Sequence, residues 1–335
     1  MTQKLSQIQQ SGEGSSDVLP LISMLIAIVA LSLAAIFIKL SERELGPFAT
    51  IFNRFWVAYI VLRVWHEWES WRWPLAKLFP QRQAGLGPSH SAEDDAPEST
   101  PQTRRDQLWL VAAALMFWGC IALWAWSLTR TEVANSTLLH NLTPLFTTLG
   151  GWLFLNQRFD RQFLLGLMVA IIGAGALGFG DLQLSTAHLT GDIASLLSAV
   201  FSAANLMIIE KLRPKFSVNT ILQWCCFWGA IWTLPVVLLT EERLFPISAS
   251  GWGSVICLAV VCQVLGQGLQ AFSLKRLSSG LVGILLLLDP VLAALTAWVL
   301  FAESLTLFKW SAFFVVLLGV YLAKSSETAT QEEPC

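Results

Sequence analysis

The sequence predicts an all-α polytopic membrane protein with ten transmembrane helices, arranged as two inverted five-helix repeats. Composition is the first reason. Hydrophobic residues make up 55% of the 335 residues and charged residues 13%, about half of the roughly 25% typical of soluble domains. The mean hydropathy of +0.60 agrees. The second reason is a series of long apolar runs, and the third is an internal repeat of the sequence.

Ten apolar runs are long enough to cross a bilayer, which takes about 20 mostly apolar residues. Because they are continuously apolar, they favour helices over the alternating strands of a transmembrane barrel. The ten predicted spans are 19–40, 46–63, 108–128, 133–155, 162–180, 190–210, 218–239, 251–273, 279–301 and 306–323.

The segments outside these runs are polar. Residues 1–18 form a polar N-terminal tail, and we expect the first run to be a retained span rather than a signal peptide. Residues 64–82 combine four tryptophans with basic side chains, which is typical of a membrane interface. Residues 83–107 are rich in Pro, Ser, Gln and acids and predict a disordered tether. Residues 325–335 form the second tail.

Lysine and arginine are distributed unequally between the two sides of the predicted spans. Five lie on one side: Lys39, Arg43, Arg130, Arg243 and Lys309. Fifteen lie on the side of the two tails and of the 64–107 loop. Cytoplasmic loops carry the excess of positive charge, so both termini are predicted in the cytoplasm of a cell-membrane protein.

The two halves of the chain align with each other. At an offset of 146 residues, 125–136 matches 271–282 and Pro144 coincides with Pro290. We therefore predict one repeat at 19–180 and a second at 188–324. Each repeat crosses the membrane five times, which is an odd number, so the two copies have opposite orientations. Inverted repeats of this kind are typical of secondary transporters, with the substrate site near the membrane midplane.

Short motifs near the spans resemble a known family. They are Pro47-Phe48-Ala49 followed by Arg54-Phe55, Pro144 followed by LFLNQRF, and Pro290 followed by VLFAESL. Together with the ten spans and the repeat, they are similar to the drug/metabolite transporter superfamily, in particular its ten-helix members with two EamA domains. The resemblance covers about residues 20–323. It implies export of metabolites, such as amino acids and related compounds, or of amphipathic drugs.

The chain departs from the family at one turn. The Gly-Glu-Arg-like turn that usually ends these stretches is replaced by Asn156-Gln157-Arg158 in the first repeat and by Ala302-Glu303-Ser304 in the second.

Polar side chains within the spans are the candidates for a substrate cavity, because such groups normally face the bundle interior. Gln263, Gln267 and Gln270 follow a spacing of i, i+4 and i+7, which places three amides on one face of an α-helix. The alternative is that they join helices by hydrogen bonds. The other expected cavity residues are Asn53, Arg54, Trp124, Thr137, Asn141 and Asn205.

Charged and bent positions suggest further roles. We expect Arg54 to hold a substrate carboxylate or to pair with Asp289, although its side chain also has the length to reach the interface. Asp289 and His140 are the candidates for proton coupling. Pro144 and Pro290 interrupt the helical hydrogen bonding of their spans and are candidate hinges, or else static kinks. Glu210, at a span end, is expected to be solvated.

The sequence favours a secondary transporter of small organic metabolites over other classes. The remaining alternatives are an intramembrane enzyme, although neither H-E-x-x-H nor G-x-S-x-G is present, and a channel. A Walker motif is absent, so ATP is not the expected energy source. We predict no enzymatic activity, no cofactor, no metal and no obligate protein partner. A net charge of −2 argues against nucleic acid, which leaves the solute and the lipid bilayer as partners.

Overall fold

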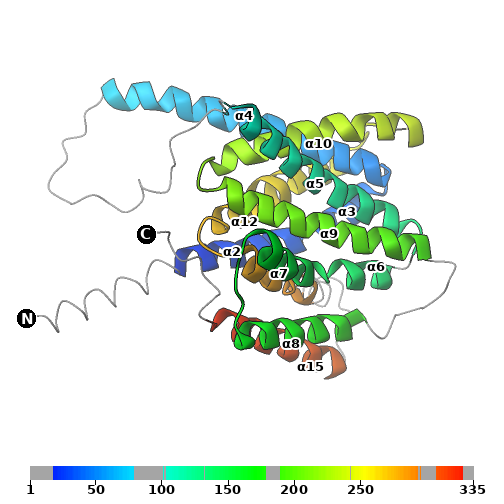
Figure 1. The fold of residues 1–335 in the computed structure, drawn as a ribbon. Helices are drawn as coiled ribbons and strands as arrows, with labels where there is room; N and C mark the ends of the chain where they lie inside the picture. Colours follow the sequence, from blue (N-terminus) through cyan, green and yellow to red (C-terminus); the bar gives the residue numbers. More distant parts are fainter. Residues whose placement is uncertain are drawn as a thin grey trace, which may run out of the picture.

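The computed structural model describes residues 18–78, 101, 103–131, 133–178, 189–241, 243–292, 295 and 307–326. These residues form a bundle of helices that run roughly along one common direction (Figure 1). In chain order the elements are α2 (Val18–Ser32), α3 (Ala34–Ser41), α4 (Pro47–Leu78), α5 (Arg104–Leu128), α6 (Val133–His140), α7 (Thr143–Phe154), α8 (Arg161–Gly178), α9 (Leu189–Leu212), α10 (Val218–Thr240), α11 (Ala249–Cys257), the π-helix η3 (Leu258–Gly266), α12 (Gln267–Ser273), α13 (Ser279–Leu286) and α15 (Leu307–Lys324).

The ten predicted spans coincide with helices wherever the structure describes them, which confirms the predicted fold class. Six spans are single helices, whereas the first, fourth, eighth and ninth are divided into shorter pieces. Within the described ranges, five helical stretches are long and apolar enough to cross a membrane, and two of them are the divided stretches Leu19–Ser41 and Ala249–Ser273. Most of the second half of the ninth span, after residue 292, lies outside the described residues.

The helices next to the 64–107 loop are longer than predicted. Helix α4 continues to Leu78 and has 32 residues, more than the roughly 20 that a bilayer requires, so it extends beyond the bundle (Figure 1). Helix α5 begins at Arg104, so the predicted tether ends earlier than expected. The hydroxyl of Thr103 caps this helix by accepting a hydrogen bond from the backbone N–H of Asp106, at 3.3 Å. The predicted disorder of residues 83–100 falls outside the described residues.

The broken helices show the repeat directly. Helices α6 and α13 each contain eight residues. Their first residues, Val133 and Ser279, are separated by the same offset of 146 residues as Pro144 and Pro290. Proline cannot donate a hydrogen bond and clashes with the carbonyl four residues earlier. Each helix ends at the residue with that carbonyl, which is His140 in the first repeat and Leu286 in the second. In the first repeat the hydroxyl of Thr143 donates to that carbonyl, of His140, at 2.7 Å.

Acidic side chains satisfy several helix starts. Glu241 accepts hydrogen bonds from the backbone N–H groups of Phe48 and Ala49, at 2.7 and 3.0 Å, where α4 begins. In the opposite direction, Glu44 accepts from Ser248 at the start of α11, and these hydrogen bonds hold the pKa of Glu44 below its ordinary value. Each carboxylate thus stabilises the positive N-terminal end of a helix in the other repeat.

Glu210 requires a correction, because the expectation of a solvated side chain is wrong. It is 6% exposed and accepts hydrogen bonds from Gln157 Nε2 at 2.6 Å and from the backbone N–H of Ser279 at 2.9 Å. The backbone N–H at the start of α13 has no acceptor within its own helix. Its hydrogen bond to the carboxylate stabilises Glu210 inside the bundle rather than in water.

Helices α8 and α15, the fifth and tenth spans, lie side by side along one edge of the bundle (Figure 1). Glycines allow their backbones to touch. A Cβ atom added to Gly166 would lie 2.4 Å from the backbone nitrogen of Ala323, and one added to Gly319 would lie 2.3 Å from that of Ala170. Small residues are the usual means of close packing between membrane helices.

We expect Gly319→Ala to lower the stability of the folded protein by about 1–3 kcal/mol, since the two backbones must separate to accept the new methyl group. The measurement is the apparent melting temperature of the purified protein in detergent. Gly253→Ala is the matched control, because nothing lies within 4 Å of a Cβ at that helical position. An equal loss of stability in both variants would contradict the packing argument.

Candidate functional site

Arg54 is buried in the middle of the bundle. It lies on α4, is 8% exposed, and its Nε donates a hydrogen bond of 2.7 Å to Oε1 of Gln263 on η3. Gln263 itself is completely buried. The guanidinium therefore turns inward to a residue 209 positions away in the chain, rather than reaching toward the interface.

The surroundings of Arg54 are polar but uncharged. Three thiols lie within electrostatic range of the guanidinium: Cys120 on α5, Cys226 on α10 and Cys262 on η3. Its hydrogen-bond partner is a neutral amide, and it forms no ion pair with the residues that the structure describes. A buried cation without a counter-ion is costly, so this position favours an anionic group from elsewhere.

Asp289 lies near one of these three thiols. The Cys262 thiol lies within electrostatic range of both Asp289 and Arg54. One carboxylate oxygen of Asp289, Oδ1, is buried and has no hydrogen-bond partner. The two charged residues do not form the ion pair that the sequence allowed, since Arg54 bonds to Gln263 instead.

Several buried polar atoms, Asp289 Oδ1 included, lack hydrogen-bond partners in the described part of the chain. Leaving such an atom unpaired costs about 1–3 kcal/mol, so a group of them marks a place where water or a ligand completes the hydrogen bonds. Among the predicted site residues, the unpaired atoms are Trp124 Nε1, Gln263 Nε2, Gln270 Oε1 and Asp289 Oδ1.

His140 forms a second polar centre beside Trp124. Its Nδ1 lies 2.7 Å from the hydroxyl oxygen of Ser198 on α9. The rings of His140 and Trp124 have their centroids 6.0 Å apart at an angle of 42°. Trp124 lies one helical turn beyond Cys120 on α5, at spacing i, i+4, and therefore on the same face as the thiol near Arg54.

Other predicted cavity residues form hydrogen bonds that hold the bundle together. The amide of Asn53 donates to the carbonyls of Ala49 and Leu244, at 2.8 and 2.6 Å, and accepts from the Trp56 indole at 2.9 Å. The amide of Asn205 donates to the carbonyl of Ala113 at 2.9 Å, which joins α9 to α5.

Thr137, on α6, and Asn141, in the break between α6 and α7, are both half-buried. There the backbone N–H of Asn141 donates to the carbonyl of Thr137, at 2.9 Å. Both residues stay close in sequence to His140, on the segment that Pro144 interrupts.

The three glutamines do not follow a regular α-helix. Their expected common face assumes 3.6 residues per turn, but Gln263 belongs to the π-helix η3, and Gln267 and Gln270 belong to α12. The wider π-turn rotates Gln263 relative to the other two. Gln263 and Gln270 are buried, at 0% and 6% exposure, whereas Gln267 is half-buried. Segments of π-helix occur frequently at functional sites.

Sequence reasoning missed two kinds of contributor. Cys120, Cys226 and Cys262 are not among the predicted site residues, yet they lie within electrostatic range of Arg54. Ser198 is not among them either, yet it is the hydrogen-bond partner of His140. For Ser198, the available signal was the row of small polar residues along α9. Such a row identifies one face of the helix, but it does not show which residue of another helix each side chain contacts.

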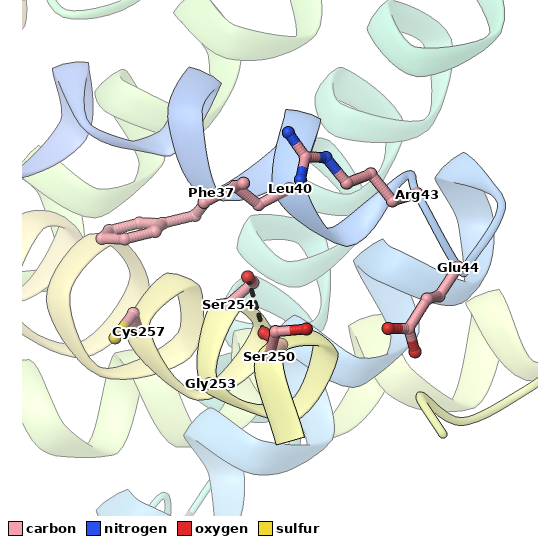
Figure 2. A pocket seen from close by; sticks show the side chains of 8 residues that line it. All are labelled: Phe37, Leu40, Arg43, Glu44, Ser250, Gly253, Ser254 and Cys257. Carbon is pink, nitrogen blue, oxygen red and sulfur yellow. Dashed lines mark hydrogen bonds between the residues drawn. The ribbon is translucent and has the colours of Figure 1, made fainter. Parts of the chain in front are cut away.

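A cavity of about 320 Å³ lies elsewhere, between α3 and α11 (Figure 2). Phe37 and Leu40 line it from α3, Arg43 and Glu44 from the following turn, and Ser250, Gly253, Ser254 and Cys257 from α11. It contains none of the predicted site residues. The described residues contain no cluster of His, Cys, Asp and Glu that could hold a metal ion.

Comparison with known proteins gives two family matches within the chain. Residues 18–179 and 189–324 each match the model of the EamA-like transporter family. A solved crystal structure superimposes with a TM-score of 0.73 at 17% sequence identity, covering 91% of this chain and 96% of that one. At this level of identity the superposition shows the shared fold.

Similar proteins are named as transporters. An uncharacterized transporter of Archaeoglobus fulgidus is 22% identical over 302 residues, which is 87% of this chain and 92% of that protein. A probable amino-acid metabolite efflux pump of Salmonella typhimurium is 26% identical over 56% of this chain, and a pseudopaline exporter of Pseudomonas aeruginosa is 24% identical over 53%. These last two matches cover 66% and 61% of the respective proteins.

Proposed function

We propose that this chain, which belongs to the EamA-like transporter family, is a secondary transporter that exports small organic metabolites by alternating access between its two repeats. The family and the names of its relatives indicate a transporter rather than an enzyme. Secondary transporters with inverted repeats bind solute near the midplane, at discontinuous helices. The breaks before Pro144 and Pro290 supply such helices, and we propose both as hinges.

The observation that carries the proposal is the buried guanidinium of Arg54, bonded to a neutral amide. We propose that it binds the carboxylate of the solute, with Gln263, Gln267 and Gln270 along the same cavity. Guanidinium and carboxylate form strong, charge-assisted hydrogen bonds, often in pairs. Asp289, whose carboxylate has an unpaired oxygen, supplies the complementary site for an ammonium group or a proton.

A solute with both a carboxylate and an amine, as in an amino acid, matches this pair of sites best. The relatives named for amino-acid metabolites and for pseudopaline support that choice. We further propose that Asp289 or His140 couples solute movement to protons.

The proposed function is tested with purified protein in lipid vesicles. Amino acids and related metabolites are screened for counterflow, with and without a pH gradient across the vesicle membrane. We expect saturable flux that is accelerated by solute on the opposite side. Flux that does not saturate and is not accelerated in this way would support the channel alternative. Chemical conversion of the solute would support the intramembrane enzyme.

The topology makes a separate prediction. The start of α2, the end of α4 and the end of α15 lie at the same end of the bundle (Figure 1). With the positive charge counted above, we propose that this end faces the cytoplasm of the cell membrane. Reporter fusions after residue 335 and within 83–100 are therefore expected to be active in the cytoplasm only. A reporter active outside the cell at either point would contradict the assigned orientation.

A further inference from the structure

The two ring nitrogens of His140 have different environments. Nδ1 lies 2.7 Å from Oγ of Ser198, whereas Nε2 has no hydrogen-bond partner within the described residues. The backbone of this residue is held as well, since α6 ends here and Thr143 donates to its carbonyl at 2.7 Å. The imidazole is thus fixed at one nitrogen and open at the other.

The hydroxyl of Ser198 determines which nitrogen carries the proton. Ser198 Oγ lies 2.9 Å from the backbone carbonyl oxygen of Ser195, which only accepts hydrogen bonds. A hydroxyl has one proton, and donating it to this carbonyl leaves the oxygen of Ser198 as an acceptor. His140 Nδ1 must then be the donor. The opposite arrangement would leave two oxygens in contact with no proton between them.

An unpaired donor lies on the ring beside the imidazole. The indole Nε1–H of Trp124 is buried without a partner, and its ring packs at 6.0 Å from the imidazole, centroid to centroid. A neutral imidazole protonated at Nδ1 has a lone pair at Nε2. The two neighbouring rings therefore present one acceptor and one donor.

We propose that Ser198 holds His140 as the neutral Nδ1–H tautomer, so that His140 Nε2 and Trp124 Nε1–H together bind a solute group that both donates and accepts a hydrogen bond. A hydroxyl and a primary amide have this chemistry. The proposal rests on the proposed function and extends it, because it gives the solute a polar side group in addition to its carboxylate. It also makes His140 a binding residue and leaves proton coupling to Asp289.

The position of the pair fits a solute already held by Arg54. Trp124 follows Cys120 by one helical turn on α5, and Cys120 lies within the electrostatic range of the guanidinium. One turn of helix is about 5.4 Å. The side-chain amide of glutamine begins four bonds from its carboxylate carbon, and these bonds together with the hydrogen bonds at both ends cover such a distance. The second repeat has Leu286 at the position equivalent to His140, so the acceptor that His140 provides has no counterpart there.

The tautomer is measured by nitrogen NMR of full-length protein in lipid, labelled with ¹⁵N-histidine. The chain has four histidines, so the His140 signals are identified as those missing in His140→Gln. Protonated and bare ring nitrogens have well-separated signals. We expect a protonated Nδ1 and a bare Nε2 in the wild type. Ser198→Ala is expected to move the proton to Nε2, whereas Ser198→Thr, which keeps the hydroxyl, retains the original form.

Binding is measured in the same samples with two amino acids of similar size. Glutamine carries a primary amide and is expected to shift the Nε2 signal, whereas leucine lacks the amide and is expected to leave it unchanged. Loss of one neutral hydrogen bond corresponds to about 1 kcal/mol, so His140→Asn, which is too short to reach with an acceptor, should bind glutamine roughly fivefold more weakly.

Two results would overturn the inference. The first is a wild-type His140 that carries its proton on Nε2 or on both nitrogens. The second is an Nε2 signal that neither glutamine nor serine shifts at saturating concentration. A bare Nε2 that glutamine shifts, in vesicles that show no counterflow of any solute, would support the inference and count against the proposed function alone.

Discussion

Replacing Arg54 with glutamine is expected to weaken the apparent affinity for a carboxylate-bearing solute by about ten- to a hundredfold. Hydrogen bonds to charged groups contribute about 1.5–3 kcal/mol, and each 1.4 kcal/mol corresponds to about a factor of ten. Glutamine keeps a polar side chain but removes the charge that the solute carboxylate needs. The measurement is the concentration dependence of counterflow in vesicles, with an amino acid as the solute.

Arg63→Gln is the matched control for this experiment. It makes the same change on the same helix, but Arg63 is exposed and paired with Glu67 at 3.3 Å, one turn away. Surface pairs of this kind contribute little to stability, so folding and transport should both be retained. If Arg54→Gln kept its affinity while the yield of folded protein fell, the guanidinium would have a structural role, and the proposed binding site would be wrong.

The fold was predictable because each feature that determines it is local in sequence. Apolar runs indicate the spans, and Pro144 and Pro290 indicate the breaks, which occur at equivalent positions in the two repeats. The length of α4 was underestimated because its last turns lie beyond the apolar run, where hydropathy no longer reports on helix formation. The capping of α4 by Glu241 could not be predicted either, because Phe48 and Glu241 are far apart in the chain.

The site was less predictable because it consists of tertiary pairs. Sequence patterns identified Arg54 and Gln263 separately, but they could not show that the two side chains meet across 209 residues. The common face of the three glutamines was deduced from α-helical spacing, and the π-helix at 258–266 alters that spacing. The role of Ser198 depends on a distance to His140, and a row of serines along a helix carries no such information.

Asp289 gives the second large effect. It lies directly after the break in the ninth span, and its Oδ1 is buried without a partner in the described part of the protein. An unpaired carboxylate inside the bundle is costly, so we propose that it binds a cation, which is either a proton or the ammonium of the solute. In the proposed mechanism, competition between these two cations for one carboxylate couples export of the solute to entry of a proton.

Asp289→Asn is therefore expected to abolish accumulation driven by a pH gradient, while exchange of solute without a gradient continues. Asparagine has nearly the same volume and still forms hydrogen bonds, but it does not bind and release protons. Asp106→Asn is the matched control, because that carboxylate lies at the start of α5 and is paired with Lys215 at 2.6 Å, away from the site. Gradient-driven accumulation should persist in this control. If it persisted in Asp289→Asn as well, Asp289 would not be the coupling residue, and transport would draw its energy from another group or from the solute gradient itself.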